Sequence, residues 1–180
     1  MAVENDKYDS RDHAAVGVAA PDFTLKKEND ENWSLSENLG RVTVLLFYPQ
    51  DETLVCTKQL CSVRDNWEAY LDTKAEIVGI SPGSVDDHKS FSTRYGLTLS
   101  LLVDENRKIT NIYGKHWLYP ISFTRAIVVI DAKGIIRSRQ VMLRAFRPKD
   151  ADVITSIYAA RSDALVDRYD SVRKRLSRSS

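Results

Sequence analysis

Both cysteines of this 180-residue chain lie in one short stretch, PQDETLVCTKQLC, which covers residues 49–61. Cys56 and Cys61 are five positions apart, whereas simple dithiol redox motifs use Cys-x-x-Cys and zinc sites use four ligands at tighter spacing. Cys56 follows an apolar run and begins a helical pattern, so we expect it at or near a helix N-terminus. The free N–H groups and the dipole there favour a thiolate, which is the nucleophilic form of cysteine.

Three other residue types around Cys56 fit peroxide chemistry. Thr53 places a hydroxyl three residues before the thiol, Pro49 stiffens the loop, and Arg125 opens an apolar strand that can bring a cation to the same end of a sheet. A thiolate beside these donors could attack one peroxide oxygen while the other leaves as hydroxide. Taken alone, Cys56 would be read as a small buried apolar residue and Arg125 as a structural ion-pair partner.

The stretch Pro49-Gln-Asp-Glu-Thr53-Leu-Val-Cys56 carries a family signature: Pro, three residues, Thr or Ser, two residues, Cys. Its flanks APDFTL, LLFYPQDET, CTKQLCSVRD, VGISPGSVDDHKSF, YGLTLSLLVDE and RAIVVIDAKG agree with it. With these motifs, the chain resembles the peroxiredoxins, and most closely the bacterioferritin comigratory protein group, also called peroxiredoxin Q. The resemblance runs from about residue 18 to the final helix. One departure is Leu54-Val55, where the group usually has Pro-Gly.

The resemblance implies a role for each site residue. Cys56 would be the peroxidatic cysteine, Thr53 and Arg125 would activate the peroxide, Pro49 would shield the intermediate, and Cys61 would be the resolving cysteine. The expected cycle reduces hydrogen peroxide and organic hydroperoxides through a Cys56 sulfenic acid and a Cys56–Cys61 disulfide. A dithiol protein, thioredoxin or a similar reductant, would then reduce this disulfide. No metal, flavin or haem is needed, and the group contains monomers and homodimers.

Other functions remain open at this point. They are a dithiol oxidoreductase, a non-enzymatic thiol redox sensor, and a metal-binding chaperone that uses Cys56, Cys61 and His116. We expect His88 to be a surface or helix residue without a catalytic role. Trp117 lies in a loop before Arg125, where it could line the pocket.

Alternation of strands and helices, followed by a hairpin, predicts an α/β protein with a thioredoxin-like fold. The fold has a mixed central sheet, helices on both faces and an N-terminal β-hairpin. We expect strands at residues 21–25, 42–48, 76–81, 99–104, 125–131 and 134–141, and helices at residues 56–71, 84–96, 105–114 and from 148 onward.

Composition limits the classes of protein. The formal net charge of +1 gives no field that would attract nucleic acid, and no apolar run is long enough to span a membrane. Residues 1–17 form a polar segment, which we interpret as a flexible arm before a single domain at residues 18–180. This segment resembles neither a secretory signal nor a transit peptide, so we expect a cytoplasmic protein. Apolar residues at helical spacing extend the last helix to about Leu176.

The spacing of the cysteines predicts a conformational change. Five residues along an α-helix separate two α-carbons by roughly 8.6 Å. A disulfide needs them within about 7 Å. If the helix begins at or before Cys56, it must unwind over about residues 53–61 before Cys56 and Cys61 can bond.

Overall fold

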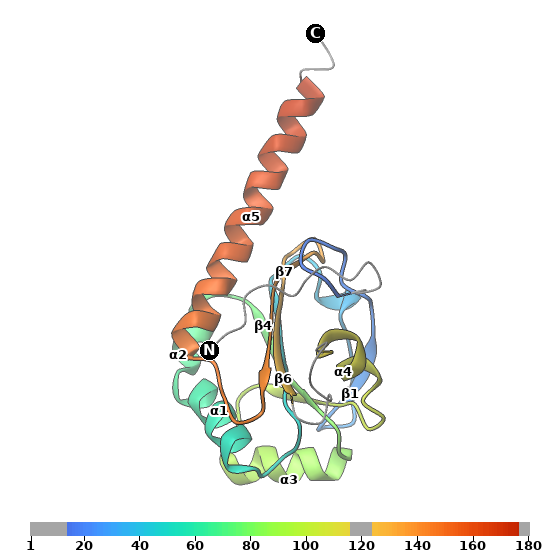
Figure 1. Ribbon diagram of the computed structural model, residues 1–180, viewed down its shortest axis with the longest axis vertical. Coiled ribbons are helices and arrows are strands. Elements are labelled where there is room, and N and C mark those ends of the chain that lie inside the picture. Colours follow the sequence, from blue (N-terminus) through green and yellow to red (C-terminus); the bar gives the residue numbers. More distant parts are fainter. Residues whose placement is uncertain (1–13, 116–123, 177–180) are drawn as a thin grey trace.

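The computed structural model describes residues 14–115 and 124–176, with side chains in the last helix described to residue 163 and at residue 165. A seven-stranded mixed sheet, in the order β2-β1-β5-β4-β3-β6-β7, forms the centre of the domain (Figure 1). Its strands are β1 (Thr24–Lys27), β2 (Asn32–Ser34), β3 (Thr43–Phe47), β4 (Glu76–Ser81), β5 (Ser100–Val103), β6 (Thr124–Ile130) and β7 (Ile136–Leu143).

Strands β3, β4 and β5 are parallel, whereas β1, β6 and β7 pair antiparallel with their neighbours. The crossovers between the parallel strands are helical, as parallel pairing requires. The helices are η1 (Ser36–Asn38), α1 (Leu54–Asp65), α2 (Trp67–Asp72), α3 (Val85–Tyr95), α4 (Lys108–Tyr113) and α5 (Asp150–Leu176).

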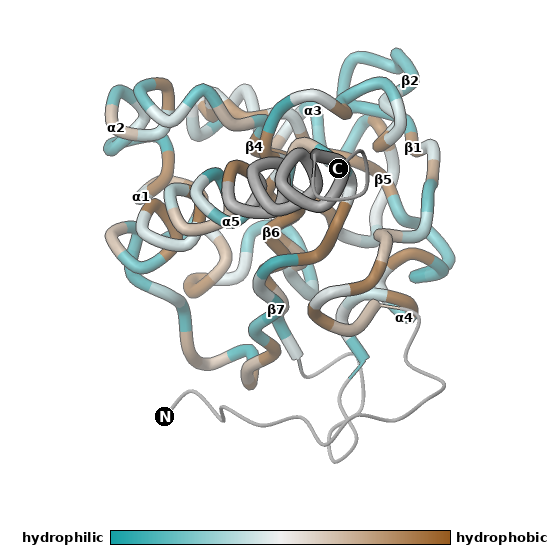
Figure 2. Tube along the Cα trace, turned by 90° about the horizontal axis from the view of Figure 1, so that it is seen from above, coloured by the Kyte–Doolittle hydropathy of each residue, from teal (hydrophilic) through white to brown (hydrophobic). Residues whose placement is uncertain are grey.

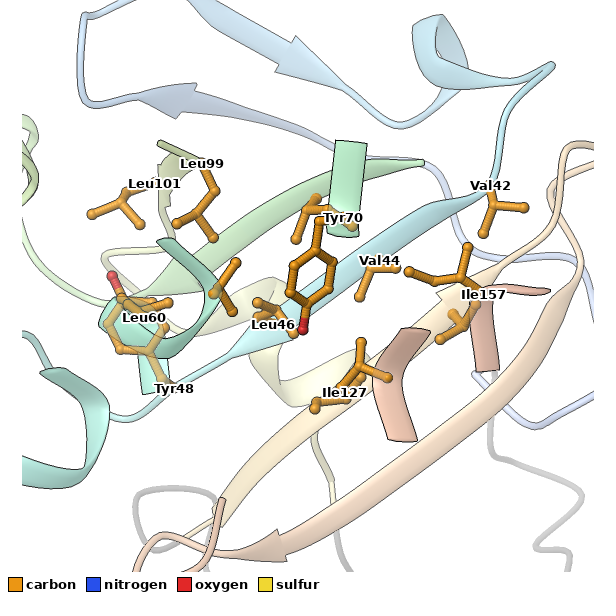
Figure 3. Close-up of a cluster of buried hydrophobic side chains, with 14 of the residues drawn as sticks. Val42, Val44, Leu46, Tyr48, Leu60, Tyr70, Leu99, Leu101, Ile127 and Ile157 are labelled. Atoms are coloured by element: carbon orange, nitrogen blue, oxygen red, sulfur yellow. The ribbon is translucent and has the colours of Figure 1, made fainter. Parts of the chain in front are cut away.

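Two apolar cores lie on opposite faces of the sheet. Because side chains alternate along a strand, Val44 and Leu46 of β3 point into the first core and Leu45 and Phe47 into the second. The first core takes side chains from α1, α2, α3 and α5 (Figure 3), and the second from α4 and the N-terminal hairpin. Figure 2 shows the apolar character of the central strands β4 and β6. Helices on both faces and a mixed sheet confirm the predicted fold class.

The helix expected over residues 56–71 is two helices, and this prediction was wrong in its continuity. Asn66 ends α1 with φ −103° and ψ 19°, and α2 starts at the next residue. The Asn66 side-chain amide donates to Ser62 O at 2.9 Å and to Asp150 Oδ2 at 3.1 Å. A side chain that bonds nearby backbone in this way offers an alternative to helix continuation. This bend positions Tyr70 to fill the first core.

Part of the expected N-terminal arm belongs to the folded domain. Residues 1–13 lie outside the described residues, but Ala14 is buried and the Gly17 N–H donates to Ile136 O at 2.7 Å. The first strand also starts later than expected. The Asp22 carboxylate accepts from the N–H groups of Phe23 and Ser36, which holds a turn before β1 begins.

The last helix ends at Leu176, as predicted, and extends away from the domain (Figure 1). Its buried side chains within the described part are Val153, Ile157 and Ala160, all in its first three turns. Across residues 14–115 and 124–176, none of the helices has the length and apolar character of a transmembrane span.

Candidate active site

The carboxyl end of β3 positions Cys56. The chain leaves β3 through Tyr48 and Pro49, turns at Glu52 with a left-handed φ of 58°, and enters α1 at Leu54. Thr53 is the N-cap of this helix, and its hydroxyl accepts from the Cys56 N–H at 3.4 Å. Cys56 is therefore in the first turn of α1, as the sequence predicted, and its side chain is fully buried.

Arg125 reaches the thiol from the neighbouring strand β6, which pairs antiparallel with β3. Its Nη2 lies 3.1 Å from Cys56 Sγ, and the residue is 1% exposed. A buried guanidinium at this distance stabilises negative charge on the sulfur, because little water screens the pair. The structure thus brings Arg125, Thr53 and Cys56 together, and Pro49 is buried at the start of the same loop.

Two further contacts fix the Arg125 side chain, and sequence analysis did not identify them. Its Nη1 donates to Gln59 Oε1, and its Nη2 donates to Arg144 O at 3.4 Å. Gln59 is three residues after Cys56, so the two share one face of α1, and this spacing was a signal available in the sequence. The Nε atom has no partner among the described residues, which leaves a buried donor beside the thiol.

Cys61 lies in the interior of α1 and is half-buried, and both cysteines are free thiols. The helix is unbroken from Leu54 to Asp65, so helical geometry separates the two α-carbons by roughly 8.6 Å. This arrangement confirms the predicted helical position of Cys61. The two thiols cannot form a disulfide while the helix stays intact.

A buried polar cluster contacts residues 49–53, which we call the active-site loop. His88 was expected to be a surface or helix residue; it is in α3, but its side chain is completely buried. Its Nδ1 is 2.7 Å from Asp51 Oδ2, and the other Asp51 oxygen accepts from the Tyr48 hydroxyl at 2.8 Å. Sequence analysis missed Asp51 and His88 as a pair because 37 residues separate them in the chain.

A pocket of about 500 Å³ opens beside the same loop. Its lining residues come from the loop, from the turn before α3, from α3 and from the residue before α4: Pro49, Gln50, Asp51, Glu52, Pro82, Gly83, Asp87, Ser90 and Arg107. Arg107 donates to Pro49 O at 3.3 Å and so supports the loop from this side. The pocket does not include Cys56, so it is a second feature of the loop rather than the thiol site itself.

The metal-binding alternative finds no support in the described part of the chain. No group of three or more His, Cys, Asp or Glu side chains that could hold an ion occurs there. His116 and Trp117 lie outside the described residues. The cation that contacts Cys56 is Arg125, and a positive charge at that position repels a metal ion.

The sequence profile of the AhpC/TSA family matches residues 16–139. Two chloroplastic peroxiredoxin Q proteins are similar to the chain. The protein from Populus jackii is 40% identical over 126 residues, which are 67% of this chain and 57% of that protein. The protein from Arabidopsis thaliana is 41% identical over 122 residues, with 67% and 56% covered. The chain thus spans little more than half the length of these relatives.

A solved structure agrees with these sequence comparisons. The chain is similar to the peroxidoxin BcpB of Mycobacterium tuberculosis, with a TM-score of 0.70 and 26% identity. The alignment covers 83% of this chain and 99% of that protein. The expected resemblance is therefore confirmed in both sequence and fold.

The same comparisons correct the expected localisation. We expected a cytoplasmic protein from the composition of residues 1–17, but the curated relatives are chloroplastic proteins. These chloroplastic relatives contradict the expectation. The composition of a short segment of this chain does not determine the compartment.

Proposed function

Because the chain belongs to the AhpC/TSA family, we propose that it is a thiol peroxidase that reduces hydrogen peroxide and organic hydroperoxides with Cys56 as the nucleophile. The observation that carries this proposal is the buried contact of 3.1 Å between Cys56 Sγ and Arg125 Nη2 at the first turn of α1. A cation and a helix N-terminus together favour the thiolate, and the same donors can bind an oxygen that gains charge.

In the first step the Cys56 thiolate attacks one peroxide oxygen. An S–O bond forms and the O–O bond breaks, so that sulfur is oxidised to sulfenic acid and the peroxide is reduced. The second oxygen leaves as hydroxide or alkoxide and takes a proton from water. Arg125 N–H groups stabilise this leaving oxygen, since charge-assisted hydrogen bonds strengthen as its negative charge grows.

Thr53 and Pro49 shape the space around the reacting sulfur. The Thr53 hydroxyl oxygen accepts from the Cys56 N–H, which leaves its own O–H able to donate to a peroxide oxygen. Pro49 is buried and has no N–H, so it adds no competing donor and shields the sulfenic acid from water.

The second half of the cycle uses Cys61 as the resolving residue. Its thiol condenses with the Cys56 sulfenic acid, which forms a disulfide and releases water. Thioredoxin, or a dithiol protein like it, then reduces the disulfide by thiol exchange. This exchange regenerates the free thiols of Cys56 and Cys61, and the cycle needs no further cofactor.

The test of this function is hydrogen peroxide consumption driven by thioredoxin, thioredoxin reductase and NADPH. The wild-type protein is expected to turn over in this assay. Cys56→Ser is expected to abolish turnover with the fold unchanged by circular dichroism, because Cys56 supplies the attacking sulfur. Substantial turnover in the Cys56→Ser protein would show that Cys56 is not the attacking nucleophile.

The alternative functions give different results in the same assay. A non-enzymatic redox sensor would form the disulfide once but would not sustain peroxide consumption. A dithiol oxidoreductase would instead reduce a disulfide substrate such as insulin. Both alternatives would also use a thiolate that Arg125 stabilises, so sustained peroxide turnover, and not the contact itself, separates them from a peroxidase.

A further inference from the structure

The loop of residues 49–53 is joined to helix α3 by a buried ion pair that the peroxidase mechanism does not use. His88 Nδ1 lies 2.7 Å from Asp51 Oδ2, with the His88 side chain fully buried and the Asp51 side chain 12% exposed. Asp51 is in the loop between Pro49 and Thr53, whereas His88 is on α3. The pair therefore connects the loop that leads into Cys56 to helix α3.

The surroundings of the imidazole favour a proton on each ring nitrogen. Nε2 lies 3.3 Å from Ser81 O and 3.3 Å from Leu102 O, which only accept hydrogen bonds, and 3.4 Å from the Ser81 hydroxyl, which can accept or donate. Nδ1 faces the Asp51 carboxylate, which is also an acceptor. A neutral ring protonated at Nδ1 would place the Nε2 lone pair against two carbonyl oxygens, with only the Ser81 hydroxyl able to donate to it. A neutral ring protonated at Nε2 would place the Nδ1 lone pair against the carboxylate, so the geometry favours the imidazolium.

The titration of His88 agrees with this geometry. Burial lowers the pKa of His88, but the hydrogen bond and the charge of Asp51 and the bonds to the Ser81 and Leu102 carbonyls outweigh it, so that the pKa is raised. A raised pKa in the folded state means that the pair stabilises the fold fully below the ordinary pKa of about 6.5. That stabilisation is lost as the pH rises through the folded value.

The titratable and charged groups around the pair come from the loop after β3, from α3 and from the residue before α4. Burial and then the Asp51 charge raise the pKa of Tyr48 well above its ordinary value, so its hydroxyl remains a donor to Asp51. Asp87 is exposed on α3 beside His88, and its pKa is lowered chiefly by hydrogen bonds from Ser84. Glu52 and Arg107 line the pocket with Asp51. Among these groups, His88 is the one for which the geometry favours a removable charge.

Asp51 is also linked to the thiol through Tyr48. The Tyr48 hydroxyl donates to Asp51, and the Tyr48 ring packs in the first core with Cys56 and Leu60; Figure 3 shows Tyr48 and Leu60. Glu52, the next residue, has a left-handed backbone that a non-glycine residue adopts only when its surroundings hold it. The exposed bridge between Glu52 and Arg94 contributes little to this, because water screens it.

We propose that Asp51 and His88 are positioning residues for the peroxidase reaction. Their ion pair holds residues 49–53 in the conformation that presents Thr53 and Cys56, and loss of the His88 proton releases this loop. This inference rests on the proposed function for its kinetic consequence, whereas the loop tether itself can be observed without peroxide. The expected signature is a decrease in the peroxide reaction rate on the alkaline side.

The substitution Asp51→Asn separates positioning from titration. The amide N–H that it introduces can donate to the Nδ1 lone pair of a neutral His88, the amide oxygen can still accept from Tyr48, and Nε2–H still bonds both carbonyls. This variant keeps the tether without the removable proton. Asp51→Ala removes the tether at every pH. Glu52→Gln is the matched control, since it changes a neighbouring carboxylate whose ion pair is exposed.

The experiment measures the second-order rate of the reduced protein with hydrogen peroxide between about pH 5 and pH 10 by stopped flow, a range that brackets the ordinary histidine pKa. Amide exchange of residues 50–56 is followed over the same range without peroxide. Asp51→Ala is expected to lower the rate at neutral pH by at least ~10-fold, as misplacement of reacting groups does. Asp51→Asn is expected to recover most of that rate and to lose the alkaline decrease, while Glu52→Gln keeps the wild-type profile.

Two results would overturn the proposal. One is a wild-type and an Asp51→Asn profile with the same alkaline decrease; the other is a full rate in Asp51→Ala at neutral pH. If Asp51→Ala does not fold, the comparison of wild type with Asp51→Asn decides alone. If Cys56→Ser turns over peroxide, the proposed function fails, but amide exchange still tests the tether. If the protection of the loop amides, relative to their intrinsic exchange rate at each pH, stays unchanged across the range, that result counts against the ion pair itself.

Discussion

The guanidinium of Arg125 lies among apolar strands, where an uncompensated charge is costly. Its two Nη atoms donate to Gln59 Oε1, Arg144 O and the Cys56 sulfur, whereas its Nε has no partner among the described residues. A negative charge that develops on the Cys56 sulfur would therefore be stabilised by the buried cation. Cys56 thus helps to compensate the buried charge of Arg125, and Arg125 in turn favours the reactive form of Cys56.

Arg125→Ala is expected to lower the second-order rate with hydrogen peroxide by at least ~100-fold, because it removes a donor that stabilises developing charge. The measurement is stopped-flow kinetics of the reduced protein, followed by the intrinsic tryptophan signal. Arg41→Ala is a suitable control, since Arg41 forms an exposed bridge to Glu76 at the ends of β3 and β4 that lie away from Cys56. A rate for Arg125→Ala equal to that of the control would return Arg125 to a purely structural role.

The site residues that could be predicted from the sequence are those whose position follows from local pattern. Cys56 and Thr53 follow from the loop and the helix N-cap, and Arg125 follows from a strand whose end meets the same sheet edge. The Asp51–His88 pair could not be predicted, because a histidine on an amphipathic helix is usually exposed and its partner is distant in sequence. Its burial depends on how α3 packs over β4 and β5, which only the tertiary structure shows.

At the scale of elements, α1 is held at both ends by different contacts. Its first two turns are fixed by the Thr53 cap and by the bond between Gln59 and Arg125. Beyond Cys61, the Asp150 carboxylate at the start of α5 accepts hydrogen bonds from α1, α2 and the residue between them, namely Ser62, Asn66 and Tyr70. Cys61 is the last residue before the part of α1 that Asp150 holds.

This arrangement limits the unwinding that disulfide formation needs. Once the Thr53 cap and the Gln59–Arg125 bond are broken, α1 can unwind from its N-terminal end. The contacts of Asp150 then stop the unwinding at Ser62. The oxidised protein is expected to exchange amide protons faster across residues 53–61 than the reduced protein, with residues 63–70 unchanged. Hydrogen exchange with mass spectrometry measures both segments in one experiment.

Cys61→Ser provides the control for that experiment. It cannot form the disulfide, so peroxide should leave its α1 protected and should arrest it at the Cys56 sulfenic acid, detected by a dimedone adduct. Its turnover with thioredoxin should fall well below that of the wild-type protein. A Cys61→Ser protein that cycles at the full rate, or an oxidised wild-type protein with an intact helix, would contradict the resolving role.

At the scale of the whole molecule, the domain and the outer part of α5 are built differently. The hairpin β1–β2 and the pair β6–β7 complete the sheet on both sides of the parallel strands, and the prediction of this architecture succeeded because alternation and turn signals are local. In α5, burial is confined within the described side chains to the first three turns, whereas Leu165 is 66% exposed. Figure 1 shows the helix continuing away from the sheet beyond that part.

The stability of the domain should therefore depend on the first half of α5 and little on the second. Removal of residues 164–180 is expected to change the free energy of unfolding by less than ~1 kcal/mol, because surface changes outside packed contacts have small effects. Ile157→Ala, by contrast, removes a fully buried side chain from the first core and should cost about 2–5 kcal/mol. Urea denaturation at two protein concentrations measures both. A large loss of stability in the truncated protein, together with a concentration-dependent midpoint for the full chain, would instead show that the outer half of α5 packs against a second copy, since association stabilises the folded state by mass action.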